Sequence, residues 1–341
     1  MKAAFVANGG GVELREIQRP NLEEGSIMVK MKASGICGTD LEKIRGEYTV
    51  SSVLGHEVSG VVSDSKSPLF VKGDSVVPHH HVACGNCYFC THGAETMCRG
   101  FRDSNFDPGG MAFEFRVPEY NVSRGGVHMM RGLSYEEASF AEPLGCCIRA
   151  QNKALGGKQE IEASLVVGAG PVGLLHMELL RSRFPEARLV AVDISKTRLD
   201  FAEKNEGAIP VDANNNPEFS VDALKHSRID GFDLVIVATG NERAFSQSVK
   251  CVRKSGTLLL FGAPPKGSKY ELDLQSFLLH DLSFMSSYAT TELEMDIALK
   301  LLENKKINVK KFVTTIFPLQ RVKEAMDAAG SESFVKVLVA G

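Results

Sequence analysis

Residues 164–180 read SLVVGAGPVGLLHMELL, and this stretch decides the fold class of the second half of the chain. A short apolar run, Ser164–Val167, leads into a glycine loop of the pattern G-x-G-x-x-G, and an apolar helical stretch follows to Leu180. The first glycine of such a loop permits a tight turn, the second admits a pyrophosphate, and the third lets the helix pack closely on the strand. The helix N-terminus adds N–H groups for the phosphates. We therefore expect a dinucleotide site that includes Gly168, Gly170, Pro171, Val172 and Gly173.

A carboxylate at the end of the next apolar run makes the nucleotide prediction specific. Asp193 closes the run VAVD, 20 residues after Gly173. A carboxylate there accepts hydrogen bonds from the adenosine ribose and repels a 2′-phosphate, so we expect NAD rather than NADP. Arg198 and Thr239 are two further candidate cofactor contacts.

Alternation of strands and helices continues from the glycine loop toward the C-terminus. Strand-like runs are found at 188–192, near 209, at 232–238 and at 257–261, with helical stretches at 195–205 and 242–252. This alternation predicts βαβ units and a parallel sheet.

The flanking parts of the chain have a different pattern of predicted secondary structure. Before residue 142 short β-like runs are bounded by turn residues, at 2–7, 26–33, 57–63 and 75–78, which is typical of an all-β unit. After residue 286 the expected elements, at 292–304, 312–317, 319–328 and 336–339, do not extend the alternation. We therefore expect two domains: residues 1–142 with 286–341, and residues 143–285.

Composition sets the broad class. The chain has 341 residues, which at roughly 150 residues per domain also suggests two domains. With 43% apolar and 24% charged residues it is typical of a globular protein, and its net charge of −3 offers no basic excess for nucleic acid. The sequence has neither a signal-peptide core nor a long apolar span, so we expect a cytoplasmic protein.

Four cysteines form a cluster of metal-ligand spacing. Cys84, Cys87, Cys90 and Cys98 lie within fifteen residues. Four thiolates at such spacing close a tetrahedral zinc shell and leave no open position, so we expect a structural zinc lobe over residues 84–98. The run His79–His81 precedes the lobe; because four sulfurs already satisfy the ion, we expect these histidines to be exposed in a loop.

Three other segments carry possible metal ligands. In the sequence, Cys37 is two residues before Thr39, which carries a hydroxyl, and His56 directly precedes Glu57. Glu142 lies where the β-rich part of the chain gives way to the part with alternating strands and helices. Together they offer sulfur, nitrogen and oxygen, which suits a catalytic zinc with three protein ligands and one open position. We expect the other cysteines, at 146, 147 and 251, to be buried apolar residues.

Six motifs in order resemble one known family, the zinc-dependent medium-chain dehydrogenases that act on alcohols, polyols and threonine. They are GICGTD at 35–40, GHE at 55–57, the four cysteines, AEPL at 141–144, GAGPVG at 168–173 and Asp193. The resemblance covers nearly the whole chain. It implies an α/β protein: a GroES-like β-rich catalytic domain into which a Rossmann domain, a doubly wound parallel six-stranded sheet, is inserted.

The resemblance also implies roles for single residues. Cys37 and His56 match the ligands of the catalytic zinc, Glu142 matches the third ligand, and Glu57 matches a carboxylate that ligates directly or exchanges with water. Thr39 matches the hydroxyl that relays the substrate proton, and Lys336 matches a basic residue that reaches the cofactor phosphates. Two zinc ions per chain, NAD and a homodimer or homotetramer are implied, with edge strands near 283–287 as the contact.

The expected reaction is hydride transfer from a secondary alcohol, in a polyol, sugar or amino alcohol, to NAD. Two other enzymes stay open: an L-threonine 3-dehydrogenase, which needs a cation such as Arg45, Arg102 or Arg149 for the substrate carboxylate, and a simple secondary alcohol dehydrogenase. A zinc- and NAD-binding scaffold without turnover is the alternative from another class. Glu42 stands where many relatives have histidine, which leaves the proton exit route open. The substrate depends on loops at 47–53, 101–110 and 288–292.

Overall fold

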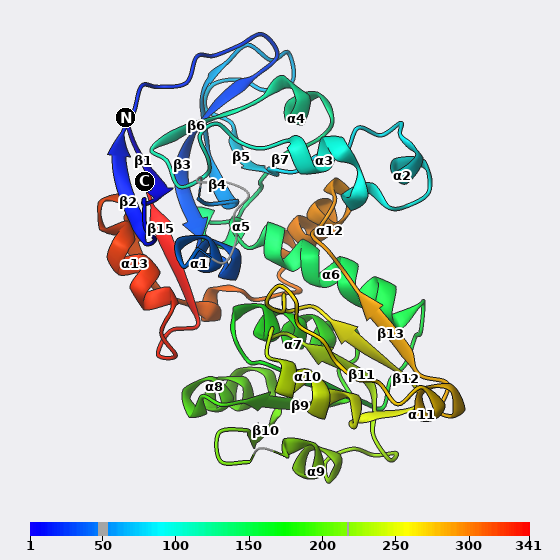
Figure 1. Ribbon diagram of the computed structural model, residues 1–341. Coiled ribbons are helices and arrows are strands. Elements are labelled where there is room, and N and C mark those ends of the chain that lie inside the picture. The colour runs from blue at the N-terminus through cyan, green and yellow to red at the C-terminus, as the bar shows by residue number, and fades with distance from the viewer. Residues whose placement is uncertain (47–53, 217) are drawn as a thin grey trace. The chain divides into compact units, whose positions relative to one another are not determined.

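The computed structural model describes residues 1–46, 54–216 and 218–341, so the expected pocket loop 47–53 lies outside the described residues. The chain divides into two compact units (Figure 1): Met1–Gly145 with Ala289–Gly341, and Cys146–Tyr288. Each junction falls three residues after the one expected from the sequence (145 against 142, and 288 against 285). Among the described residues, no helix has the length and apolar character needed to cross a membrane.

The unit Cys146–Tyr288 is built on a six-stranded sheet. Its elements are β8 (Ala163–Val167), α7 (Pro171–Arg183), β9 (Arg188–Asp193), α8 (Lys196–Glu206), β10 (Ile209–Asp212), α9 (Phe219–Leu224), β11 (Phe232–Val237), α10 (Glu242–Val249), β12 (Val252–Leu260), α11 (Leu274–Leu279) and β13 (Ser283–Ser286). The strand order is β10-β9-β8-β11-β12-β13, and every pairing is parallel. This is the doubly wound order of dinucleotide-binding sheets, so the predicted fold class is confirmed.

The strand sequences explain this sheet. Every residue of β8 and β11 is buried, as their near-continuous apolar runs require of parallel strands covered on both faces. The helix expected over 242–252 ends at Val249, because the chain turns into β12 at Val252.

The other unit is β-rich, as expected. It contains β1 (Lys2–Val6), β2 (Val12–Glu16), β3 (Ile27–Gly35), α1 (Gly38–Ile44), β4 (Glu57–Ser65), β5 (Ser75–Pro78), α2 (Tyr88–Thr91), α3 (Arg99–Asp103), β6 (Glu114–Val117), α4 (Glu119–Ser123), β7 (Val127–Met129), α5 (Tyr135–Ala138), α12 (Glu292–Glu303), β14 (Val313–Pro318), α13 (Val322–Ala329) and β15 (Lys336–Ala340). The helix α6 (Ala141–Leu155), which the sequence analysis did not predict, begins in this unit and carries the chain into the other.

Strands from both ends of the chain share the main sheet of this unit. The order is β14-β15-β3-β4-β5-β7, with β6 also paired to β3, while β1 and β2 form a separate ribbon. Gly35 at the end of β3 pairs with Glu57 on one side and with Leu338 on the other. The last strand therefore lies beside the segments that lead to Cys37 and to His56.

Candidate functional site

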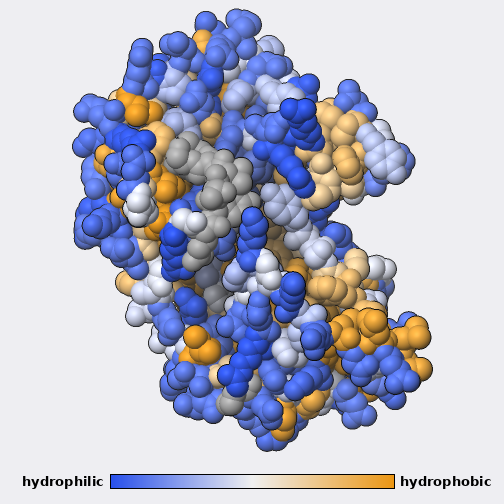
Figure 2. Space-filling model, in the orientation of Figure 1, coloured by the Kyte–Doolittle hydropathy of each residue, from blue (hydrophilic) through white to orange (hydrophobic). Residues whose placement is uncertain are grey.

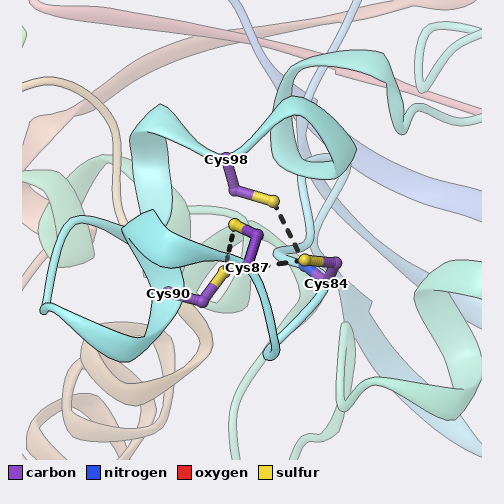
Figure 3. Close-up of side chains that lie close together, drawn as sticks. All are labelled: Cys84, Cys87, Cys90 and Cys98. Atoms are coloured by element: carbon purple, nitrogen blue, oxygen red, sulfur yellow. Dashed lines mark hydrogen bonds between the residues drawn. The ribbon is translucent and has the colours of Figure 1, made fainter.

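The cysteine lobe (residues 84–98) brings four thiols together. Figure 3 shows the four sulfurs turned toward a common centre; they all lie within 4.8 Å of one another, and all four cysteines are free of disulfides. The N–H of Cys84 donates to the Sγ of Cys98 at 3.4 Å. A backbone hydrogen bond from Asn86 is the largest of the contacts that lower the pKa of the Cys84 thiol to about 6. Four thiols within reach of one centre, one of them with a lowered pKa, fit zinc, which binds thiolates.

A second group of possible ligands forms where β3 ends and β4 begins. Cys37 caps α1, His56 directly precedes β4, and Glu57 is the first residue of that strand. One ligand atom from each lies within 4.8 Å of the others. We call this group the Cys37–His56 site.

Asp40 holds the two segments of the Cys37–His56 site together, and the sequence analysis assigned it no role. It is fully buried, and its carboxylate accepts the N–H of Cys37 and the N–H of Gly55, each at 3.1 Å. One oxygen also lies 3.8 Å from Nδ1 of His56. The motif GICGTD contains this aspartate, and its spacing of three residues from Cys37 is a capping-box signal.

The electrostatics of the Cys37–His56 site favour a cation. Burial by itself lowers the pKa of His56, but the negative charges of Cys37, Asp40 and Glu142 outweigh it and raise this pKa to about 10. The same field attracts a divalent ion, and the thiolate and imidazole donors suit zinc. The residues present therefore fit the metal that the sequence predicts.

Lys336 has a different partner from the one expected. Its side chain is buried; its Nζ donates to the carbonyl of Ile36 at 2.9 Å and forms an ion pair with Glu57. Gly35 makes room for this pair, because a Cβ there would lie 2.0 Å from Oε2 of Glu57. These are the contacts of Lys336 within the β-rich unit, and its role toward the cofactor phosphates stays a prediction.

The expectation that residues 79–81 are exposed is wrong. His79 is fully buried and His80 and His81 are half-buried, because the segment continues inward from β5 and the amide of Asn121 holds the carbonyls of His79 and His80. Glu142, buried in the first turn of α6, lies with His79 and His80 in one group of potential ligands within 4.8 Å. No periodicity or spacing in the sequence signalled this group.

The remaining candidates in this unit are at the surface or partly buried. Thr39 is half-buried in the first turn of α1, and Arg45 and Arg102, the proposed carboxylate-binding cations of a threonine dehydrogenase, are both exposed. Of the three cysteines expected to be buried, Cys147 and Cys251 are, whereas Cys146 is only half-buried.

The glycine loop of the other unit has the geometry of a nucleotide-binding turn. It joins β8 to α7, and Gly170 caps the helix. A Cβ on Gly173 would lie 1.8 Å from the carbonyl oxygen of Gly168, so only glycine allows this close helix–strand approach. Asp193, at the end of β9, accepts the N–H of Ala169 at 2.6 Å and that of Ser195 at 2.8 Å. The carboxylate is thereby fixed beside the loop, as dinucleotide recognition requires.

Arg198 and Thr239 both lie next to this loop. If Gly170 carried a Cβ atom, that atom would lie 3.9 Å from a guanidinium nitrogen of Arg198. A Cβ atom built on Gly168 would lie 3.5 Å from the Cβ of Thr239. The structure thus brings together the predicted cofactor residues of this unit. Lys336 belongs to the other unit.

A doubly wound sheet with a nucleotide-binding turn, and a β-rich unit with two cysteine-containing groups of potential metal ligands, are typical of one class, the zinc- and nucleotide-dependent dehydrogenases. Known families match in the same order: residues 23–125 match the alcohol dehydrogenase GroES-like domain, and residues 171–304 match the zinc-binding dehydrogenase family. The chain belongs to the zinc-dependent medium-chain alcohol and polyol dehydrogenases. It is therefore an enzyme, and the scaffold alternative is set aside.

Similar proteins include both alcohol and polyol dehydrogenases. An alcohol dehydrogenase of Geobacillus stearothermophilus is 30% identical over 96% of this chain and 96% of its own length. D-arabinitol dehydrogenase 1 of Uromyces fabae is 28% identical over 94% of this chain and 91% of its own length. Among solved structures, a zinc-binding dehydrogenase of Sinorhizobium meliloti bound to NADP gives a TM-score of 0.87 at 25% identity, covering 100% of this chain and 99% of that one.

Proposed function

We propose that this dehydrogenase oxidises a secondary alcohol of a polyol, sugar or amino alcohol and reduces NAD. The observation that carries the proposal is the Cys37–His56 site, in which a thiol and an imidazole from distant segments lie within reach of one ion. Several similar proteins act on polyols, among them a D-arabinitol dehydrogenase and a D-altritol 5-dehydrogenase. These relatives support the polyol class, while the alcohol dehydrogenases among the similar proteins keep simple secondary alcohols in the substrate screen.

The metal would be held by Cys37 and His56, with Glu142 as third ligand. Zinc bound there supplies Lewis acidity toward the alcohol oxygen, which lowers the pKa of a bound hydroxyl by many units. Glu142 is among the charges that raise the pKa of His56, which supports its place near the same ion. Asp40 positions both segments through the N–H groups of Cys37 and Gly55.

The chain's other residues at this site would manage charge and protons. Thr39, half-buried two residues after Cys37, accepts the alcohol proton and passes it on. Glu57 forms a buried ion pair with Lys336. Its carboxylate therefore stands beside the metal ligands without leaving an uncompensated buried charge.

Asp193 supports NAD as the cofactor. Its carboxylate is held beside the glycine loop by two backbone N–H groups, where it would accept the ribose hydroxyls and repel a 2′-phosphate. Replacing it, Asp193→Gly, should lower kcat/KM for NAD about tenfold to a hundredfold, the value of a charged hydrogen bond, and raise that for NADP. Steady-state kinetics with both cofactors measure this; unchanged selectivity would remove Asp193 from the ribose.

A homodimer would form through the edge of the parallel sheet. β13 is the last strand in the sheet order, and the exposed apolar residues Leu274, Leu278, Leu279 and Phe284 lie on it and on α11. Figure 2 shows this apolar patch on the face of the unit that carries α11. An unpaired edge beside an apolar patch fits a second copy of the chain. Sedimentation of Leu278→Glu against wild type tests this: the variant should be monomeric.

The central test is a screen of sugars, polyols, their phosphates, threonine and simple alcohols, with NADH formation as the readout. We expect the highest kcat/KM for a polyol or sugar. Threonine as the preferred substrate would overturn the expected preference for polyols and sugars and favour a threonine dehydrogenase. A cytosolic location would fit the eight cysteines, none of which forms a disulfide.

A further inference from the structure

Two neighbouring histidines after β5 lie beside the carboxylate of Glu142. One ligand atom each from His79, His80 and Glu142 falls within 4.8 Å of the other two. His79 is fully buried and its Nε2 atom has no hydrogen-bond partner; Nδ1 of His80 is also buried and unpartnered. A buried polar atom without a partner costs free energy, so two such atoms on histidines that share a ligand group with a carboxylate point to a ligand that would satisfy them.

An unpartnered nitrogen alone does not make a site. Nε2 of His128 and Nε2 of His176 are also buried without partners. Neither of these histidines belongs to a group of three potential metal ligands in residues 1–46, 54–216 and 218–341. His79 and His80 differ because each has a second imidazole and a carboxylate within reach.

The ring of His79 is held in the orientation of a metal ligand. Its Nδ1 lies 3.1 Å from Oε1 of Glu292, and since a carboxylate only accepts, Nδ1 is the donor of this contact and Nε2 is the nitrogen left for a metal. Metal-binding histidines are commonly fixed by a carboxylate in this way. The amide of Asn121 donates to the carbonyls of His79 and His80 at 3.0 and 2.9 Å, which fixes the backbone of both.

We propose that His79, His80 and Glu142 form a second divalent-metal site beside the Cys37–His56 site, with the carboxylate of Glu142 shared between them. Two imidazoles and one carboxylate are a donor set that holds zinc in enzymes. The centroids of the His80 and His56 rings are 5.0 Å apart, so the two donor sets are neighbours. Pairs of ions in two-metal enzymes lie about 3.5–4 Å apart, a spacing that a shared carboxylate allows.

The use of this site rests on the proposed function, whereas its existence does not. A polyol carries an oxygen next to the one that is oxidised. With one ion on each oxygen, the enzyme would favour vicinal diols over alcohols with a single hydroxyl. The second site would then set the substrate class, while the Cys37–His56 site supplies the Lewis acid.

Zinc content tests the site directly. Full-length wild type and variants are dialysed against the same buffered free Zn²⁺, and zinc per chain is counted by atomic emission. His80→Phe keeps an aromatic ring and removes the nitrogen donors, so it should hold one zinc fewer than wild type. His81→Phe is the matched control: His81 contacts the carbonyl of Ser104 at 2.7 Å, lies outside the donor group, and should keep the wild-type content.

A double variant, His80→Phe with Cys37→Ser, distinguishes two separate metal ions from a single ion that both residues would bind. Cys37→Ser should also lose one zinc, and the double variant with His80→Phe should lose two. A double variant that loses no more than Cys37→Ser alone would mean a single ion, and would overturn the proposal. So would wild-type zinc content in His80→Phe.

Cobalt absorption gives a second readout. In Co²⁺-loaded protein His80→Phe should lose one cobalt with its thiolate-to-cobalt absorption unchanged. Cys37→Ser should lose one cobalt and the share of this absorption that Cys37 contributes, while the four thiolates of the cysteine lobe keep theirs. A fall of thiolate absorption in His80→Phe would count against a separate site. If circular dichroism shows that His80→Phe is unfolded, His80→Asn replaces it. Failure of every alcohol to reduce NAD, with the zinc counts as expected, would sink the proposed function and leave the site standing.

Discussion

The cysteine lobe and the Cys37–His56 site are both built from metal-ligating side chains, but they assemble in opposite ways. The lobe takes its four thiols from fifteen consecutive residues, and its sulfurs meet because the local chain turns back on itself. The Cys37–His56 site depends on the pairing of β3 with β4, and Lys336 joins it from β15. The lobe is therefore a local structure whose loss should affect stability, and the second site is a tertiary structure whose loss should affect chemistry.

The largest expected effect is that of Cys37→Ser on turnover. Removing a thiolate ligand should release the catalytic zinc and with it several kcal/mol of Lewis-acid stabilisation, which corresponds to a fall in kcat of at least about a thousandfold. The fold should remain, because the backbone ladder between β3 and β4 joins the two segments that carry the site. Measurement of kcat, zinc content and thermal midpoint on one preparation tests this. A large fall in the midpoint would show that the site is structural.

Cys90→Ser is the matched variant in the lobe. Loss of a structural metal is one of the few changes that destabilise a domain by roughly 4 kcal/mol, so the thermal midpoint should fall by about 10 °C. Turnover at low temperature should change little, since the lobe's closed shell binds no substrate. Scanning calorimetry and low-temperature kinetics test the pair of expectations. If turnover falls and the midpoint does not, the roles of the two sites are reversed.

The contrast also explains what the sequence predicted and what it did not. The lobe and the glycine loop were readable because their residues are close in sequence and their spacing is set by local geometry. His79 and His80 looked like exposed loop residues because nothing nearby showed that the chain runs inward after β5. The partner of Lys336 was missed because the two residues are 279 positions apart and meet only through the sheet.

Asp40 offers a finer test of the tertiary site. Asp40→Asn keeps the shape and one acceptor but removes the charge that helps to raise the pKa of His56. Residues that orient metal ligands typically contribute tenfold to a hundredfold to metal affinity, and we expect a loss in that range at the Cys37–His56 site. Competition with a chelator measures it, and the affinity of the cysteine lobe in the same protein is the internal control. Equal weakening of both sites would indicate a global effect.

The smallest expected effect is on the acid sensitivity of folding, through His176. Unlike His56, His79 and His80, this buried histidine belongs to no group of potential metal ligands among the described residues. It lies in α7, fully buried, and burial lowers its pKa to about 3 from an ordinary value of 6.5. Below pH 6.5 this histidine binds a proton in the unfolded chain, whereas in the folded chain it does so only below about pH 3. The free energy of unfolding therefore falls as the pH is lowered through this window. Between pH 7 and pH 5 the loss amounts to about 2 kcal/mol.

His176→Met places an unbranched apolar side chain in the same space. It should remove the part of the acid sensitivity that comes from protonation of His176. Urea unfolding of both proteins at pH 7 and pH 5, followed by circular dichroism, gives the difference. Bound metal should not change it, because His176 belongs to no group of potential ligands in the described part of the chain. The same acid sensitivity in His176→Met as in wild type would mean that this imidazole takes up its proton over the same pH range in the folded protein as in the unfolded chain. Burial alone would then not keep a histidine neutral in this protein. Only the presence of neighbouring ligands, and not the protonation state, would then distinguish a metal-binding histidine from an isolated buried one.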